Sequence, residues 1–203
     1  MSTRFNSVAV VGAGAMGRGI AQIAAQAGSQ VLLYDSQPQA CRAARDTITA
    51  QWGKLAEKGR LTPEQVQQHT RRLQCVDSLQ ALADCDLVIE AIVERLDIKQ
   101  SVFAELESVV RADTVLASNT SSLSVTAIAA KLQHPQRVAG YHFFNPVPLM
   151  KVVEVIPGLK TDPAVCQRLQ EYARELSRRR AEAATRMKTP APAAAPERRA
   201  ARD

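Results

Sequence analysis

The stretch 7-SVAVVGAGAMGRGIAQIAAQAGSQVLLYD-35 decides the fold of this chain of 203 residues. Residues 7–14 form an apolar run that ends in glycine, as expected of a buried strand. Residues 15–27 carry apolar side chains at helical spacing and end at Gly28, a typical helix C-cap. Residues 30–35 read as a second buried strand. Together they predict two parallel strands joined by a crossover helix.

The same alternation continues to about residue 176. Further helices are expected at about 37–59, from Thr62 with Pro63 in the first turn, and at 97–110, 124–131 and 163–176; further strands are expected at 86–94, 114–120 and 137–143. These strands are apolar on both faces, which is typical of a parallel sheet covered by helices. The sequence therefore predicts an α/β fold, a doubly wound (Rossmann-type) mostly parallel sheet, in one domain of residues 1–176.

Residues 177–203 have a different composition. Nineteen of these 27 residues are Arg, Ala or Pro, with no apolar periodicity. Such a segment cannot bury enough surface to offset its ordering entropy, so we expect a disordered basic C-terminal tail. It holds eight basic and three acidic residues, which leaves 18 basic and 17 acidic residues in 1–176. Because the predicted domain is nearly neutral, we expect no nucleic-acid partner.

The remaining composition is that of a soluble globular protein, with 46% hydrophobic and 23% charged residues. No apolar run approaches the roughly 20 residues of a membrane helix, and the N-terminus lacks the pattern of a secretory signal. We therefore expect a cytoplasmic protein with no membrane partner. The four cysteines form no C-x-x-C pair, which favours buried structural thiols and no metal site; they are Cys41, Cys75, Cys85 and Cys166.

A G-x-G-x-x-G motif joins the first strand to the first helix. Gly12 permits a tight turn, Gly14 allows a pyrophosphate to approach the backbone, and Gly17 lets helix and strand pack closely. The helix begins with Ala15 and Met16. Its N-terminal end offers free N–H groups and a positive dipole to that anion. The motif alone is weak evidence, but the strand before it and the helix after it are those of a dinucleotide-binding loop. A glycine turn that binds nothing is the alternative.

An acidic residue ends the second strand, at the position expected for ribose recognition. Asp35 follows Gly17 by 18 residues, and Ser36 comes next rather than an arginine. A carboxylate there accepts hydrogen bonds from the adenosine ribose hydroxyls and repels a 2′-phosphate. The sequence therefore predicts NAD, rather than NADP, as the cofactor.

The run 140-GYHFFNPVPLMKVVEVI-156 contains one of only three histidines. His142 lies between aromatic residues, and Glu154 follows twelve residues later. Imidazole can accept a hydroxyl proton near neutral pH, and a carboxylate behind it fixes its tautomer. The alternative is a hydrogen-bonded core histidine without a catalytic role.

Several of these segments together resemble a known family. Residues 5–176 are similar to the NAD-binding domain of the L-3-hydroxyacyl-CoA dehydrogenases, including the relatives that act on 3-hydroxybutyryl-CoA and 3-hydroxyadipyl-CoA. The resemblance rests on the glycine loop and on "VIEAIVERLDIKQSVFAEL", "LASNTSSLSVTAIA" and "GYHFFNPVPLMKVVEVI". It implies NAD-dependent oxidation of an L-3-hydroxyacyl-CoA to the 3-ketoacyl-CoA, in fatty acid beta-oxidation or a related acyl-CoA pathway.

The resemblance also implies roles for individual residues. His142 matches the catalytic histidine and Glu154 its paired glutamate. Ser121 matches the serine that bonds the substrate oxygen, and Asn145 the asparagine beside it; both are also expected near the cofactor. Glu94 and Lys99 match positions that line the nicotinamide ribose. Lys54 and Lys58, on the long helix, are weaker candidates for binding the CoA phosphates.

Each of these positions also has a structural alternative. Ser121 or Ser122 would serve as the cap of the helix that starts near residue 124. Glu94 would be only the polar end of a strand, and Lys99 a solvated helix residue.

The chain departs from the family pattern after residue 176. Family members continue into a helical second domain, which closes over the acyl chain and forms most of the dimer interface. The homodimer expected of the family depends on that domain, whereas this sequence continues with the Arg/Ala/Pro segment. One hypothesis is that this segment is an out-of-frame reading of GC-rich DNA.

Two functions other than an active dehydrogenase of this family are also compatible with the sequence. One is a catalytically silent NAD-binding module, or a fragment completed by a second chain. The other is a beta-hydroxyacid dehydrogenase, which the lack of a K-x-x-N pattern disfavours.

Overall fold

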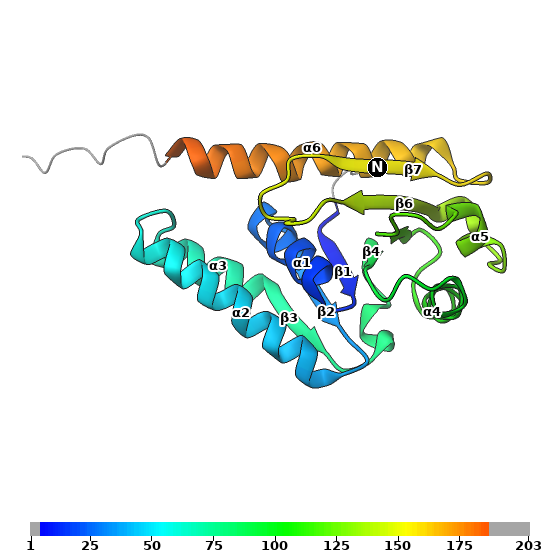
Figure 1. Ribbon diagram of the computed structural model, residues 1–203, viewed down its shortest axis with the longest axis horizontal. Coiled ribbons are helices and arrows are strands. Elements are labelled where there is room, and N and C mark those ends of the chain that lie inside the picture. The colour runs from blue at the N-terminus through cyan, green and yellow to red at the C-terminus, as the bar shows by residue number, and fades with distance from the viewer. Residues whose placement is uncertain (1–4, 187–203) are drawn as a thin grey trace, which may run out of the picture.

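The computed structural model describes residues 5–186 and contains one seven-stranded sheet (Figure 1). The strand order is β3-β2-β1-β4-β5-β6-β7. The strands are β1 (Ser7–Val11), β2 (Gln30–Tyr34), β3 (Leu73–Val76), β4 (Leu87–Glu90), β5 (Val115–Ser118), β6 (Val138–Phe143) and β7 (Val153–Pro157). All neighbouring strands pair in parallel except β6 and β7, which are antiparallel. The predicted doubly wound, mostly parallel sheet is confirmed.

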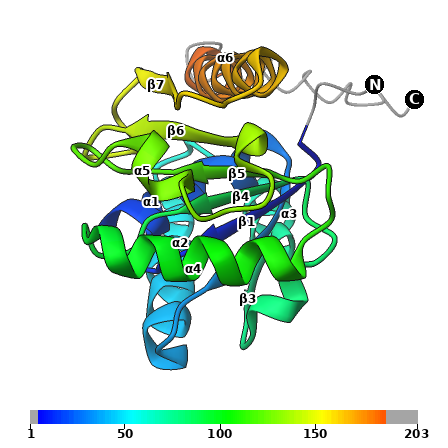
Figure 2. The ribbon, with the colours of Figure 1, turned by 90° about the vertical axis from the view of Figure 1, so that its right-hand side faces the viewer.

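Helices cover both faces of this sheet. They are α1 (Ala15–Ala27), α2 (Pro38–Glu57), α3 (Pro63–Arg72), α4 (Leu96–Val109), α5 (Val125–Ala129) and α6 (Pro163–Arg186), with short 3-10 turns η1 (Leu79–Leu82) and η2 (Pro135–Arg137). Helices α1, α2 and α3 lie on one side of the sheet and α4 and α5 on the other, while α6 runs along β6 and β7 (Figures 1 and 2).

Two hydrophobic clusters explain why the central strands are apolar on both faces. In β1, Val8 and Val10 belong to the cluster that α1, α2 and α6 complete, whereas Ala9 and Val11 belong to the cluster under α4 and α5. Successive side chains of a strand point to opposite faces, so each face needs its own apolar set. The sheet is therefore a buried middle layer.

Local signals in the sequence act as predicted. Gly28 ends α1 with φ +106°, a left-handed conformation that glycine adopts without a steric penalty. Thr62 caps α3 in a capping box with Gln65, and Pro63 occupies the first turn. The end of α1 and the start of α3 therefore lie at the predicted caps.

Several boundaries differ from the prediction. The edge strand β3 was not predicted, because a four-residue strand with one buried leucine gives little pattern. The strand predicted over 86–94 ends at Glu90, and the strand predicted over 114–120 covers only Val115–Ser118. The residues that follow both strands form loops at the carboxyl edge of the sheet.

The last helix is longer than predicted. Helix α6 continues to Arg186, ten residues beyond the predicted end at 176. Ala and Arg have high helix propensity, so this composition extends a helix already anchored by packing, with Leu176 1% exposed. The rest of the predicted disordered tail, 187–203, lies outside the described residues, and the division into a 1–176 domain and a tail stays a prediction.

The interpretation of all four cysteines as buried thiols was wrong. Cys41 in α2 and Cys75 in β3 form a disulfide, because the crossover from β2 through α2 and α3 to β3 brings these positions together. Cys85 is a buried free thiol, as predicted, and Cys166 is only half-buried. Within residues 5–186, no group of three or more His, Cys, Asp or Glu side chains has the geometry of a metal site. No helix in the same range has the length and apolar character needed to span a membrane.

Candidate functional site: the carboxyl edge of the sheet

Most of the predicted site residues lie at one edge of the sheet, in the ends of strands or in the segments that follow them. Strand β1 is flanked by β2 on one side and β4 on the other, so the strand order reverses there. In open parallel sheets ligands bind at the carboxyl ends of the strands beside such a reversal. The loops that follow β1, β2, β4, β5 and β6 carry most of the residues expected to act on cofactor and substrate.

The glycine loop requires glycine at its first position. Gly12 has φ +106°, and its N–H donates to the Tyr34 carbonyl at 2.8 Å. A Cβ at Gly12 would lie 2.6 Å from the carbonyl oxygen of Ala91, and a Cβ at Gly17 would lie 1.7 Å from the carbonyl oxygen of Gly12. Both contacts are far too short, so two glycines are needed for the turn and for close packing of α1 on β1.

The middle glycine has a different environment. Gly14 is the N-cap of α1 and is exposed, and a Cβ there would meet no atom within 4 Å. Ala15 is also exposed and Met16 half-buried, so the first turn of α1 is open to a ligand. This arrangement fits a pyrophosphate group held by the N–H groups of a helix N-terminus.

Asp35 lies beside the glycine loop at the end of β2. Its Oδ2 accepts the Ala13 N–H at 2.8 Å, and its Oδ1 accepts the Gln37 N–H at 2.9 Å. These bonds fix the carboxylate, and each oxygen keeps a second lone pair for a hydroxyl donor. The arrangement suits recognition of a ribose diol.

A buried acidic residue that the sequence analysis missed lies at the end of β4. Glu90 is fully buried and forms an ion pair with Lys99, with Nζ 2.6 Å from Oε1. Lys99 is 1% exposed, so it is not the solvated helix residue of the structural alternative. The signal for Glu90 was a carboxylate in the middle of the apolar run "DLVIEAIVE", which a buried strand tolerates only with a partner.

Glu94 connects this ion pair to the loop after β5. Its Oε2 lies 3.2 Å from the Lys99 ammonium, and its Oε1 accepts the Thr120 hydroxyl at 2.5 Å and the Ser121 N–H at 3.0 Å. Burial raises the pKa of Glu94, but the hydrogen bonds from Thr120 and Lys99 outweigh it and lower this pKa to about 2. Glu94 is therefore ionised and sits in a loop, not at the end of a strand.

The serine loop is organised around Glu94. Ser122 also donates its N–H to Glu94, at 3.3 Å, while Ser124 caps α5 by accepting the Ala127 N–H. Neither Ser121 nor Ser122 is thus the helix cap of the structural alternative. Ser121 is exposed and follows β5 by three residues.

His142 and Glu154 face each other across the antiparallel pair β6 and β7. Nδ1 of His142 lies 2.9 Å from Oε2 of Glu154, and the side chains are 17% and 51% exposed. Asn119, which the sequence analysis did not single out, accepts the Phe143 N–H at 2.9 Å and joins the end of β5 to the end of β6. The serine loop and the histidine therefore leave the sheet from adjacent strand ends.

The loop after β6 turns toward α1. Asn145 is exposed and precedes Pro146 in a cis peptide bond. Val147 is buried against α1, where a Cβ at Gly19 would lie 2.7 Å from its Cβ. This contact brings the Asn145 loop against the helix that begins at the glycine loop.

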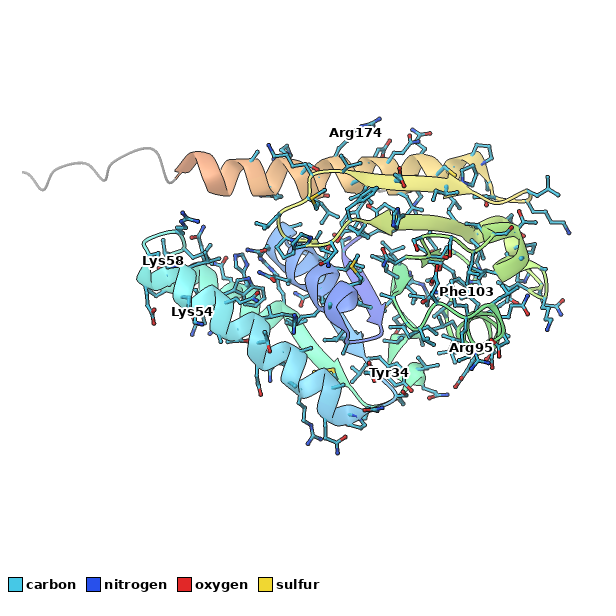
Figure 3. The ribbon with its side chains drawn as sticks, in the orientation of Figure 1. Tyr34, Lys54, Lys58, Arg95, Phe103 and Arg174 are labelled. Atoms are coloured by element: carbon cyan, nitrogen blue, oxygen red, sulfur yellow. A yellow bond between two sulfur atoms is a disulfide. The ribbon has the colours of Figure 1, made fainter. Side chains whose placement is uncertain are left out.

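The two weaker candidates lie apart from these residues. Lys54 and Lys58 are at the C-terminal end of α2, at the tip of the hairpin that α2 forms with α3 (Figure 3). Tyr34 and Arg95, which mark the carboxyl edge of the sheet, lie away from that tip (Figure 3). The structure thus brings together the predicted residues of the sheet edge but not these two lysines.

The fold and the glycine loop define a Rossmann-type dinucleotide-binding domain. Residues 7–184 match the family model "3-hydroxyacyl-CoA dehydrogenase, NAD binding domain". The chain therefore belongs to this family, which confirms the predicted family and its cofactor, NAD.

Individual relatives agree with this assignment. The chain is 48% identical over 171 residues to 3-hydroxyadipyl-CoA dehydrogenase of Escherichia coli K12, covering 84% of this chain and 36% of the relative. It is 44% identical over 171 residues to a probable 3-hydroxybutyryl-CoA dehydrogenase of Deinococcus radiodurans, covering 83% of this chain and 60% of the relative. A crystal structure of 3-hydroxybutyryl-CoA dehydrogenase from Escherichia coli K12 superposes with a TM-score of 0.84 at 47% identity, over 85% of this chain and 37% of that one. The chain thus spans less than two thirds of the length of these relatives.

Proposed function

We propose that this chain is the cofactor-binding and catalytic half of an NAD-dependent dehydrogenase that oxidises an L-3-hydroxyacyl-CoA to the 3-ketoacyl-CoA. The observation that carries the proposal is the His142–Glu154 pair at the carboxyl edge of the sheet. The relatives named as 3-hydroxyadipyl-CoA and 3-hydroxybutyryl-CoA dehydrogenases support the substrate class. A cytoplasmic location is part of this proposal.

The pair has the geometry of an oriented general base. In the tautomer with the proton on Nδ1, Glu154 accepts a hydrogen bond from Nδ1–H, and Nε2 of His142 keeps a free lone pair. Nε2 then accepts the hydroxyl proton of the substrate, and the nearby carboxylate stabilises the imidazolium that forms. Bound NAD would supply the hydride acceptor for the carbon that carries this hydroxyl.

Ser121 and Asn145 are proposed to position the substrate oxygen. Both are exposed, and they follow neighbouring strands at the same edge as His142. A hydroxyl and an amide in these places can donate to the oxygen that becomes the carbonyl. The backbone bond from Ser121 to Glu94 fixes this part of the loop and leaves the hydroxyl available.

The reverse reaction gives a direct test. NADH oxidation with acetoacetyl-CoA is followed by absorbance for the wild type, His142→Ala and His134→Ala. His134 is an exposed histidine next to η2, so its variant is a matched control. We expect His142→Ala to lose at least about a hundredfold in rate and His134→Ala to keep wild-type rate. Equal rates for all three proteins would remove His142 from the mechanism.

A second candidate function is a catalytically silent NAD-binding module, or a fragment that needs a second chain. The contacts at the carboxyl edge of the sheet suit cofactor binding whether or not the chain turns over a substrate. NADH binding without acetoacetyl-CoA reduction would support this candidate. Recovery of reduction on adding the C-terminal portion of a relative as a separate chain would support the fragment form.

A further inference from the structure

Glu90 is an ionisable residue buried in the middle of the sheet. It is the last residue of β4, and its direct neighbours in register are Val11 of β1 and Ser118 of β5. Its side chain is 0% exposed. Burying a carboxylate is costly unless hydrogen bonds and an opposite charge compensate it.

Three donors from three parts of the fold satisfy this carboxylate. Oε1 accepts from the Lys99 ammonium at 2.6 Å and from the Ile92 N–H at 2.7 Å, and Oε2 accepts the Ser118 hydroxyl at 2.7 Å. A buried ion pair stabilises a fold little compared with apolar residues of the same size. The pair therefore gives little stability that apolar residues would not also give.

Lys99 connects Glu90 to Glu94, which contacts the serine loop. The ammonium lies between Oε1 of Glu90 and Oε2 of Glu94. Oε2 of Glu94 faces Lys99, so its Oε1 is directed to the loop after β5, where it accepts the N–H groups of Ser121 and Ser122. Two carboxylates share one ammonium, so the three groups together have one net negative charge. Glu94 is the more exposed of the two carboxylates and faces the site.

We propose that Glu90 is a positioning residue, which acts through Lys99 and Glu94 to hold the serine loop in place for cofactor and substrate. The proposal deepens the dehydrogenase function above, because it assigns to that site a residue that touches neither cofactor nor substrate. Loss of the Glu90 charge leaves Lys99 with Glu94 as its only carboxylate partner among these groups. The Glu94 side chain then turns toward the ammonium, and its bonds to the serine loop lengthen.

The first test needs no cofactor. Backbone amide NMR spectra are compared for the wild type, Glu90→Gln and Asp97→Asn. Asp97 lies in α4, the helix that carries Lys99, and pairs with the N-cap residue Arg95 on the exposed surface. Its variant therefore removes a carboxylate without touching the Glu90–Lys99–Glu94 network. We expect the Ser121 and Ser122 amide protons to move upfield in Glu90→Gln, because their bonds to Glu94 lengthen, and to stay unchanged in Asp97→Asn. A folded Glu90→Gln protein with unchanged serine amides would overturn the proposal.

A milder variant covers the case in which Glu90→Gln fails to fold. Ser118→Ala removes the hydroxyl that donates to Oε2 of Glu90 and that also accepts the Thr120 N–H at 3.3 Å. We expect a smaller upfield shift of the same two serine amides. No shift in a folded Ser118→Ala protein would also count against the proposal.

The second test separates positioning from a general loss of structure. In Lys99→Met, Glu90 and Glu94 lose their shared ammonium; Val11 and Ser118 beside Glu90 are uncharged, and Arg95 is engaged with Asp97. We expect NADH affinity, measured by fluorescence, to fall about tenfold in Lys99→Met, because Glu94 loses the ion pair that directs it to the serine loop.

A double variant completes the test. If Glu90 acts through Lys99, Glu90→Gln with Lys99→Met loses no more NADH affinity than the worse single variant. Additive losses in the double variant would contradict the proposal. Failure of the wild type to bind NADH would count against the dehydrogenase function only, because the amide spectra decide the role of Glu90 without cofactor.

Discussion

His142 and Glu154 are directly opposite residues of β6 and β7, with Nδ1 2.9 Å from Oε2. They come from an antiparallel strand pair at the edge of an otherwise parallel sheet. The rigid register of two paired strands thus sets the imidazole orientation, which a loop would hold less well.

The first prediction concerns the charge of Glu154. Glu154→Gln keeps a hydrogen-bond acceptor for Nδ1–H but removes the charge that stabilises the imidazolium. We expect the kcat of acetoacetyl-CoA reduction to fall about 10- to 100-fold, while NADH affinity changes less than about twofold. Steady-state kinetics and a fluorescence titration measure the two quantities. A parallel loss of NADH affinity would mean that Glu154 acts on cofactor binding instead.

The second prediction separates two glycines of the same loop. Gly12→Ala places a Cβ 2.6 Å from the Ala91 carbonyl at φ +106°, so we expect a loss of about 2–4 kcal/mol in the free energy of unfolding. Gly14→Ala meets no atom within 4 Å, so its stability should stay within about 1 kcal/mol of wild type. The new methyl group points into the space proposed for the pyrophosphate, and NADH affinity should fall about tenfold. Urea denaturation and NADH titration of both variants check this; equal behaviour of the two would contradict it.

The third prediction concerns the choice of cofactor. Asp35→Asn removes the negative charge beside the proposed adenosine ribose but keeps one carbonyl acceptor. We expect NADH affinity to fall about tenfold and the preference for NADH over NADPH to shrink, because the repulsion of a 2′-phosphate is lost. Fluorescence titrations with both cofactors give the ratio. An unchanged ratio would show that Asp35 does not select the cofactor.

The sequence was sufficient for elements whose cause is local. The alternation of strands and helices, the Gly28 and Thr62 caps and the glycine loop all follow from residue type and spacing. The features that could not be predicted from the sequence depend on tertiary contacts. Glu90 and Lys99 are nine residues apart, and only the packing of α4 on β4 joins them. Cys41 and Cys75, 34 residues apart, are joined in the same way by the crossover from β2 through α2 and α3 to β3.

The candidate site shows the same division. His142 and Glu154 were paired from the sequence by a family resemblance, and the strand register gives that pair its geometry. The role of Thr120 and Asn119 could not be predicted, because their partners come from other strands and loops. The end of α6 was mispredicted for a different reason, since an Arg- and Ala-rich composition fits a helix as well as a disordered segment.

The fourth prediction concerns stability in mild acid and involves the hairpin of α2 and α3. His69 is 8% exposed, and its ring centroid lies 5.4 Å from that of Trp52. Burial, assisted by the charge of Arg72, lowers the pKa of His69 to about 4 from its usual 6.5. The unfolded chain therefore takes up a proton near pH 6.5 that the folded chain resists until about pH 4.

The sign of the effect follows from this difference. The contribution of neutral His69 is fully present above pH 6.5 and is lost as the pH falls from 6.5 to about 4. The loss amounts to at most about 3 kcal/mol. We expect His69→Phe, which keeps an aromatic ring against Trp52, to lose less stability across this window than the wild type. His134→Gln, at an exposed histidine, should follow the wild type. Urea denaturation at pH 7, 5.5 and 4 measures the difference, and identical pH profiles for wild type and His69→Phe would contradict the prediction.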